Sequence, residues 1–205
     1  MSVSWLRWRK KAIEDSCKQI YGAERRISNS TNVITKEGKV GLPFPPVSCR
    51  RIHRVAIALG SKGKVPFSFG DFGKGFVHVF DEISLNSIMN ELDTISDFVK
   101  YLIDKESLYS SKVETCFKGG EEDLLALYLQ NGRNFPSNYD LIIIDDNLWV
   151  NFTKKREYHA KKEADKVSYV WDRLIEIFCN DFQKEGLEFG NSLTEVEKVT
   201  RVMAQ

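Results

Sequence analysis

The chain has 205 residues, of which 42% are hydrophobic and 29% are charged, and its formal net charge at pH 7 is +1. This length and composition are typical of a globular protein rather than a disordered one, and they fit one domain or one domain with a helical appendage. No apolar run approaches the roughly 20 residues that a membrane helix needs, which predicts a protein that is not embedded in a membrane.

The N-terminus and the cysteines bear on the cellular compartment. The N-terminal basic cluster follows the few apolar residues, and neither an apolar core nor a small-residue cleavage site is present, so we find no export signal. The spacing of the cysteines differs from that of zinc ribbons and thiol-redox motifs. We therefore expect free, mostly buried thiols in the cytoplasm. The four cysteines are Cys17, Cys49, Cys116 and Cys179.

The charge is unevenly distributed along the chain. Residues 1–64 carry 14 Lys and Arg against 4 Asp and Glu, residues 65–152 carry 6 against 15, and residues 153–205 carry 10 against 10. A basic first third can attract phosphate backbones. Alternatively, the basic and acidic segments neutralise each other within the fold or across a dimer.

Apolar residues recur at three- and four-residue spacing from Trp5 to Ile27, which predicts one long amphipathic helix. A break at Asn29 to Asn32 follows, and residues 33–40 predict a small hairpin that turns at Glu37 and Gly38. We expect Gly41 to Pro46 to be a loop, because three prolines in four positions sustain neither a helix nor a central strand. The other side of the helix carries Arg7, Lys11, Glu14, Lys18 and Arg25.

The middle of the chain changes from a strand pattern to a helix pattern. Ile52 to Leu59 and Phe76 to Phe80 predict neighbouring strands, joined by a glycine-rich loop that contains three phenylalanines. Three helices are then expected. They run from Asp81 or Ser84 to Leu92, from Thr94 or Ser96 to Tyr109, and from Glu121 to Leu129. In the second helix, the expected apolar stripe is Ile95, Phe98, Val99, Leu102 and Ile103. The acids Glu121, Glu122 and Asp123 are typical of a helix start.

Two further strands, Leu141 to Ile144 and Leu148 to Phe152, are expected around an Asp145-Asp146-Asn147 turn. A long helix from Lys154 to Phe182 should follow, and a final helix should begin at Ser192 after a break at residues 186–191. The inward residues expected in the long helix are Ala164, Val167, Val170, Trp171, Leu174, Ile175 and Phe178.

These patterns predict an α+β fold, in which a small sheet is flanked by a long N-terminal amphipathic helix and followed by a mainly helical second half. The expected division is a partial restriction-endonuclease-like α/β segment at residues 1–80 and a mainly helical segment at residues 81–205. The second segment includes a short hairpin near residues 141–152.

No complete catalytic motif is present, and we predict no metal site. The sequence has no P-loop, dinucleotide fingerprint, zinc-protease helix or nucleophile elbow. Asp145 and Asp146 would fit a hard divalent cation, but tight turns select the same residue types. His53 and His78 are expected on adjacent strands, where a satisfied strand histidine is the main alternative to a ligand.

Several stretches resemble a bacterial family of longer, nuclease-related proteins. In that family, a segment resembling the PD-(D/E)XK core precedes the helix that opens this chain. The resemblance is carried by Trp8 to Ala12, Gln19 to Glu24, Arg51 to Val55, Gly75 to Asp81, Glu91 to Phe98 and Ser168 to Glu176.

The resemblance implies an upstream segment with two carboxylates that hold Mg²⁺ and a lysine that orients the reacting centre. It also implies accessory roles for Lys11 and Gln19, and less securely for Ser16. Nothing upstream of Trp5 can supply those strands and carboxylates, so we expect a fragment, a split-gene product or a degenerate member. Such a chain would have no catalysis of its own, and Mg²⁺ would be its cofactor only when the missing segment completes it.

Two functions of different class follow. In the first, Arg7, Lys11, Lys18 and Arg25 face the phosphates of a nucleic acid, which predicts salt-sensitive binding. In the second, the chain is a non-catalytic interaction module that assembles with a partner, or with itself, through an open sheet edge and its terminal helices. An independent metal enzyme built on Asp145, Asp146 and the histidines is the third and weakest candidate.

Overall fold

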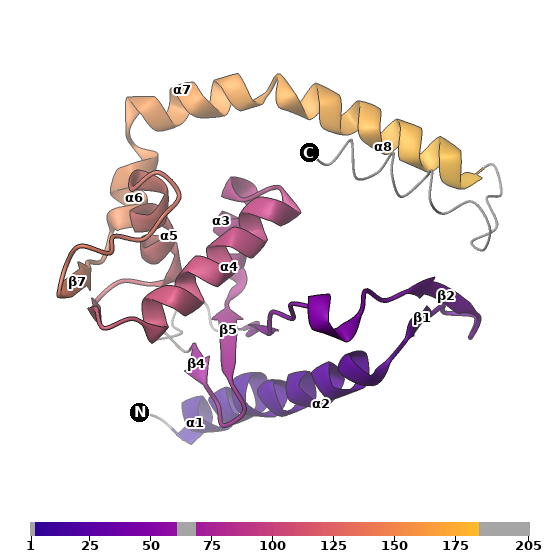
Figure 1. Cartoon of the computed structure of the whole chain (residues 1–205). Coiled ribbons are helices and arrows are strands. Elements are labelled where there is room, and N and C mark those ends of the chain that lie inside the picture. The colour runs from indigo at the N-terminus through magenta and orange to yellow at the C-terminus, as the bar shows by residue number, and fades with distance from the viewer. Residues whose placement is uncertain (1–2, 61–68, 185–205) are drawn as a thin grey trace. The chain divides into compact units, whose positions relative to one another are not determined.

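The structure is a computed structural model that describes residues 3–60 and 69–184. It divides into two compact units, one made of residues 1–28 and 51–154 and the other of residues 29–50 and 155–205. The predicted α+β class is confirmed, together with the long N-terminal helix and the mainly helical second half (Figure 1). The restriction-endonuclease-like character expected for residues 1–80 remains a prediction.

The two units have the following elements. The first contains α1 (Val3–Arg9), the π-helical stretch η1 (Lys10–Glu14), α2 (Asp15–Asn29), β3 (Val55–Ile57), β4 (Gly70–Asp71), β5 (Phe76–Phe80), α3 (Glu82–Glu91), α4 (Ile95–Ser110), β6 (Glu114–Phe117), α5 (Glu121–Gln130), β7 (Leu141–Ile144) and α6 (Leu148–Thr153). The second contains β1 (Asn32–Ile34), β2 (Val40–Pro43), the 3₁₀ turn η2 (Val47–Cys49), α7 (Arg156–Asp165) and α8 (Ser168–Lys184).

The N-terminal helix packs one face on a small sheet. Ile13 and Cys17 are buried there, and Trp8 donates its ring N–H to the carbonyl of Leu59 at 3.1 Å. The remaining buried members of this core are Ala56, Ala58, Val77 and Val79. The predicted apolar face of the helix is therefore the face that the sheet covers.

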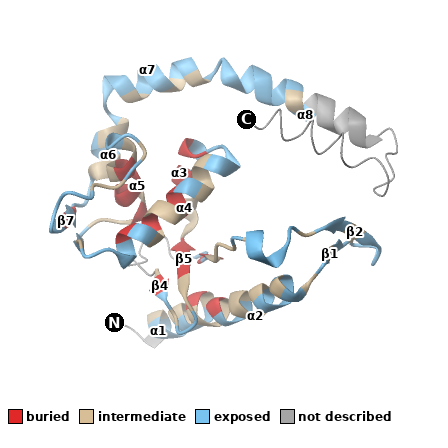
Figure 2. Ribbon diagram, in the orientation of Figure 1, coloured by how far each residue is buried: buried red, intermediate tan, exposed pale blue. Residues whose placement is uncertain are grey.

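Strand β5 is the centre of this sheet, whose strand order is β3-β5-β4. β3 runs parallel to β5 with Val55 opposite His78, and the two residues of β4 pair with β5 antiparallel. Both predicted strands are present, although the first is shorter than residues 52–59. Figure 2 shows buried residues along β5, α4 and α5, the elements around which the interior of this unit is built.

Helices α3, α4 and α5 form a second core against β5. Asp81 caps α3 by accepting the Ser84 N–H at 2.8 Å, and Thr94 caps α4 by accepting the Asp97 N–H at 3.0 Å. The expected stripe of α4 was partly wrong, because Ile95 is 84% exposed. The buried residues of this core are Phe80, Ile88, Leu92, Tyr101, Leu102, Leu125 and Tyr128.

The predicted hairpin near residues 141–152 is wrong. β7 pairs in parallel with β6, a strand that was not predicted, and α5 connects the two. Leu148 to Phe152 form helix α6 after Asn147 turns the chain with φ of 67°. The apolar residues of this short run suit a helix as well as a strand, and Asp123 favours the helix by accepting the Trp149 N–H at 2.9 Å.

In the second unit, β1 and β2 form the expected antiparallel hairpin, with Gly38 in the turn at φ of 78°. β2 extends to Pro43, so the first part of the predicted loop at Gly41 to Pro46 is strand. The predicted long helix from Lys154 is divided into α7 and α8. The last expected break and helix, at residues 186–191 and from Ser192, lie outside the described residues.

Most of the residues predicted to face inward in the long helix are exposed, which corrects that orientation; Ile175 is half-buried, and Phe178 lies outside the described side chains. Val167, Val170, Trp171 and Leu174 are 68%, 61%, 65% and 50% exposed.

Within the described part of the chain, no helix is both long and apolar enough to cross a membrane.

Three of the four cysteines have described side chains, and they differ from the expectation of mostly buried thiols; Cys179 lies outside the described side chains. Cys17 is buried, whereas Cys49 and Cys116 are exposed. Burial raises the pKa of the Cys17 thiol to about 11, which lowers the fraction of reactive thiolate.

We expect iodoacetamide at pH 8 to label Cys17 about 100-fold more slowly than Cys49 or Cys116, because Cys17 has less thiolate and no access to the reagent. Peptide mapping by mass spectrometry measures the three rates separately. In denaturant the three rates should converge. Equal rates in the native protein would contradict the packing of the first helix.

Candidate functional site

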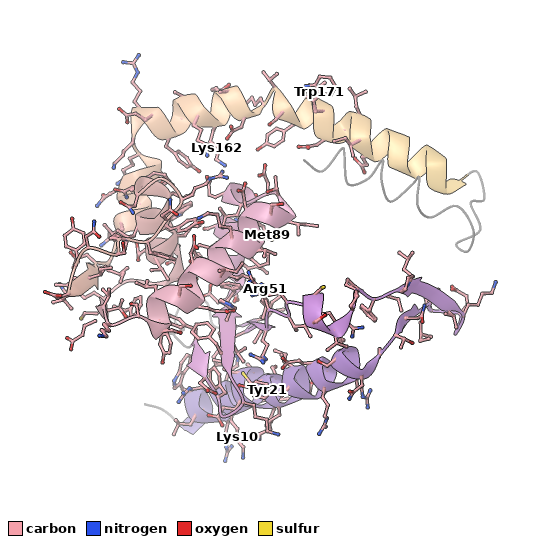
Figure 3. All side chains as sticks on the ribbon, in the orientation of Figure 1. Lys10, Tyr21, Arg51, Met89, Lys162 and Trp171 are labelled. Carbon is pink, nitrogen blue, oxygen red and sulfur yellow. The ribbon has the colours of Figure 1, made fainter. Side chains whose placement is uncertain are left out.

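The solvent-facing side of the N-terminal helix carries the predicted basic residues. Arg7, Lys11, Lys18 and Arg25 are exposed, as predicted for contact with a nucleic acid, and Lys10 is exposed beside them. Figure 3 shows Lys10 pointing away from β5, whereas Tyr21 points toward it. One side of the helix thus packs on the sheet while the other presents positive charge.

The residues implied by the family resemblance lie on the same helix in different surroundings. Lys11 and Gln19 are exposed, and Ser16 is half-buried. Lys18 pairs with Asp15 at 3.1 Å, but both side chains are largely exposed, so water and salt weaken this contact. The helix therefore places Lys11 and Gln19 at the surface, about two turns apart.

The inner side of α2 is fastened to the start of β5. Arg54 donates to both carboxylate oxygens of Glu24, each at 2.6 Å, and to the carbonyl of Phe76 at 3.2 Å. Tyr21 donates its hydroxyl to the carbonyl of Gly75 at 2.7 Å. Gly75 has φ of 104°, and a Cβ there would lie 2.7 Å from the Arg54 guanidinium. This contact requires glycine at that position.

A cluster of His53, His78 and Glu106 lies on the other side of the same sheet region. His53 precedes β3, His78 is in the middle of β5, and Glu106 is on α4. Oε1 of Glu106 is 3.2 Å from Nδ1 of His53 and 2.9 Å from Nε2 of His78. The His78 side chain is fully buried, that of His53 is 11% exposed and that of Glu106 is 37% exposed.

The environment of the cluster favours a neutral His78 imidazole and an ionised Glu106 carboxylate. Burial, and after it the charge of Lys105, lowers the pKa of His78 to about 4. Burial acts to raise the pKa of Glu106, but hydrogen bonds from His78 and His53 outweigh it and lower that pKa. Each ring can donate one N–H to Oε1 of Glu106. The other ring nitrogens, Nε2 of His53 and Nδ1 of His78, are buried without a hydrogen-bond partner in the described structure.

A buried ion pair lies beside this cluster. Lys105 donates to Oε2 of Glu121, and the Tyr101 hydroxyl donates to Oε1 at 2.7 Å. Burial lowers the pKa of Lys105 and raises that of Glu121, while the attraction between the two opposes both changes. The Lys105 ammonium also lies 4.2 Å from the centre of the Phe69 ring. Glu121 is thus a buried counter-ion in addition to its place in the first turn of α5.

The structure does not bring the predicted aspartates to the histidines. Asp145 and Asp146 are exposed, and Asp145 accepts an ion pair from Lys118 at 2.8 Å. Among the described residues, the group of potential metal ligands that comes together is His53, His78 and Glu106. A metal enzyme built on the aspartates and the histidines is therefore not supported.

Sequence reasoning identified His53 and His78 as neighbours but missed Glu106. The available signal was indirect. Lys105 falls four residues after Tyr101 and three after Leu102, so the helical period places it on the buried face, where a lysine needs an acidic partner. Glu106 follows directly and points to the adjacent side of the helix. Its two histidine partners become visible only when the register of β3 and β5 is known.

Comparison with protein-family models, with curated proteins and with solved structures found no match to this chain. The resemblance to nuclease-related proteins therefore remains a prediction.

We expect Glu24→Gln to lower the free energy of unfolding by about 1–3 kcal/mol, because it breaks a two-point, partly buried contact with Arg54. Urea unfolding followed by circular dichroism measures the change. Asp15→Asn removes an exposed ion pair from the same helix and should cost less than about 0.5 kcal/mol. Equal effects of the two variants would show that the Arg54 contact does not fasten the helix.

Proposed function

We propose that this chain is a nuclease-related bacterial protein of the cytoplasm that binds nucleic-acid backbones along its N-terminal helix. The observation that carries the proposal is the exposure of Arg7, Lys10, Lys11 and Lys18 on a helix whose opposite face is buried in the sheet. The proposal concerns binding, and no catalytic role is assigned to these residues.

The charge of this surface supports binding to phosphates. Residues 3–29 carry seven Lys and Arg against three Asp and Glu. One of those acids, Glu24, already binds Arg54 on the inner side of the helix. The outer side is therefore more basic than the composition of the helix alone indicates. Binding of lysine or arginine to a phosphate releases condensed counterions, which favours binding at low salt.

The anchoring of the helix also supports the proposal. Trp8 and Tyr21 hold it to the sheet through hydrogen bonds to Leu59 and Gly75. Cations on a fixed helix lose less conformational freedom on binding than cations on a free tail. Gln19, exposed on the same helix, adds a neutral donor that can reach a phosphate oxygen.

The test is a titration of a fluorescent DNA duplex of about 20 base pairs with the full chain at several salt concentrations, followed by anisotropy. We expect Lys11→Ala combined with Lys18→Ala to weaken binding about tenfold at low salt. Each lost phosphate contact should reduce the salt slope by about 0.9, or by roughly 2 for the pair.

The matched control removes two exposed lysines elsewhere in the same unit, by Lys112→Ala combined with Lys154→Ala. This variant has the same net charge as the first and should bind almost as tightly as the unchanged chain. Absence of binding at low salt would contradict the proposal. Equal weakening by the control would reduce it to a general effect of net charge.

A second candidate function is assembly with a protein partner or with another copy of the chain. Its main support is the exposed apolar stripe of Val170, Trp171 and Leu174 on α8, which Val167 extends just before the helix begins. Exposed apolar patches of this kind mark interaction surfaces in many proteins. The open edge was expected at the sheet of β3 and β5. A different sheet edge is added here, that of β7, which pairs only with β6 among the described strands and exposes Leu141 and Ile143.

We expect the full chain to self-associate at high concentration, and Val170→Lys combined with Leu174→Lys to reduce that association. Sedimentation velocity over a concentration series measures it. Met89→Lys, at an exposed apolar position on α3, controls for the added charge. Ile143→Lys tests whether the exposed edge of β7, rather than α8, makes the contact between copies. A monomer at every concentration would exclude self-association and leave only a different partner for this surface.

A further inference from the structure

We propose that His53, His78 and Glu106 bind one divalent transition-metal ion of the zinc class. This inference goes beyond the proposed nucleic-acid binding and does not depend on it. The three residues come from the segment before β3, from β5 and from α4. They bring two imidazole nitrogens and one carboxylate oxygen together within 4.8 Å of one another.

The distances fit a shared ion. Oε1 of Glu106 lies 3.2 Å from Nδ1 of His53 and 2.9 Å from Nε2 of His78. In a tetrahedral zinc site, ligand atoms that each lie about 2.0–2.2 Å from the ion are roughly 3.3–3.6 Å from one another, which is close to these two distances. Small side-chain adjustments would therefore be enough for all three atoms to reach the same ion.

The donor set indicates the class of metal. Two imidazoles with one carboxylate suit zinc and similar transition metals, whereas Mg²⁺ and Ca²⁺ prefer sites made of oxygen. Three protein ligands leave a fourth position open, as in zinc sites that hold a water or a substrate. Glu106 is 37% exposed, so the cluster has a side from which an ion can enter.

The surroundings hold the ligands in place. The parallel pairing of β3 with β5 places Val55 opposite His78, and the backbone N–H of His78 donates to the backbone carbonyl of Arg54 at 2.8 Å. The Phe76 ring lies edge-on to the His78 ring at 4.9 Å, and the Phe80 ring stacks on it at 6.2 Å. Lys105, the nearby cation, forms an ion pair with Glu121.

The unpaired outer nitrogens limit the affinity. When a metal binds Nδ1 of His53 and Nε2 of His78, the protons between these atoms and Glu106 leave, and each ring is neutral only if its outer nitrogen, Nε2 of His53 or Nδ1 of His78, takes up one proton from water. Neither atom has a hydrogen-bond partner in the described structure. Such outer partners typically contribute 10- to 100-fold to affinity, so we expect binding weaker by about that factor than at a fully supported site.

The test uses the full chain with Cys49→Ser and Cys116→Ser, which remove the two thiols that are exposed among the described side chains. Titration with Co²⁺ should give one bound ion per chain, with the visible absorption of a site of low coordination number. Zinc should displace the cobalt and raise the melting temperature.

Glu106→Gln and, separately, His53→Gln should each weaken binding at least about tenfold. His159→Gln alters the remaining histidine of the chain, which is exposed on α7, and should bind like the parent.

Circular dichroism of each variant tests whether it is folded. If His53→Gln fails to fold, Glu106→Gln decides the result, because the amide keeps the size and an acceptor oxygen of the original side chain. The proposal is overturned if the parent binds no cobalt. It is also overturned if Glu106→Gln binds as tightly as His159→Gln does.

Discussion

The buried ion pair between Lys105 and Glu121 constrains the centre of the first unit. Both side chains are almost wholly removed from water, at 1% and 7% exposure. Desolvation of two charges costs several kcal/mol, and the cost is met only when the partners lie in contact and their other hydrogen-bonding atoms are satisfied. Tyr101 and the rings of Phe69 and Phe80 supply that environment. The pair therefore fixes α4 relative to α5, and both relative to β5.

The ion pair also determines where Glu106 lies. Consecutive residues on a helix point about 100° apart, so fixing Lys105 toward α5 directs Glu106 toward the strands. There it meets His53 and His78, whose own positions depend on the register of two parallel strands. The basic helix is held to the same sheet from its other face through Arg54 and Tyr21. The charged outer surface of the helix and the histidine cluster are thus both positioned by the β3-β5-β4 sheet, from its two faces.

The sequence predicted those features of the fold that are set by residues close to one another along the chain. The helical period from Trp5 to Ile27, the Asp81 and Thr94 caps and the apolar run of β5 are of this kind. The exposed positions of Arg7 and Lys11 followed from the same period. Leu148 to Phe152 was misassigned because a short apolar run fits either a strand or a helix, and contact with Asp123 decides between them. Glu106 was missed because its partners are more than 25 residues away along the chain.

The long-range contacts of the first helix also affect the order in which the chain can fold. Trp8 bonds to a residue 51 positions later, and Tyr21 to one 54 positions later. β6, α5 and β7, by contrast, follow one another in the sequence, and the residues that β6 pairs with in β7 lie 27 positions later. During synthesis the first helix leaves the ribosome well before the strand it needs, because chains emerge from the N-terminus at a limited rate. Its apolar face, with Ile13 and Cys17, stays uncovered until β5 has been made.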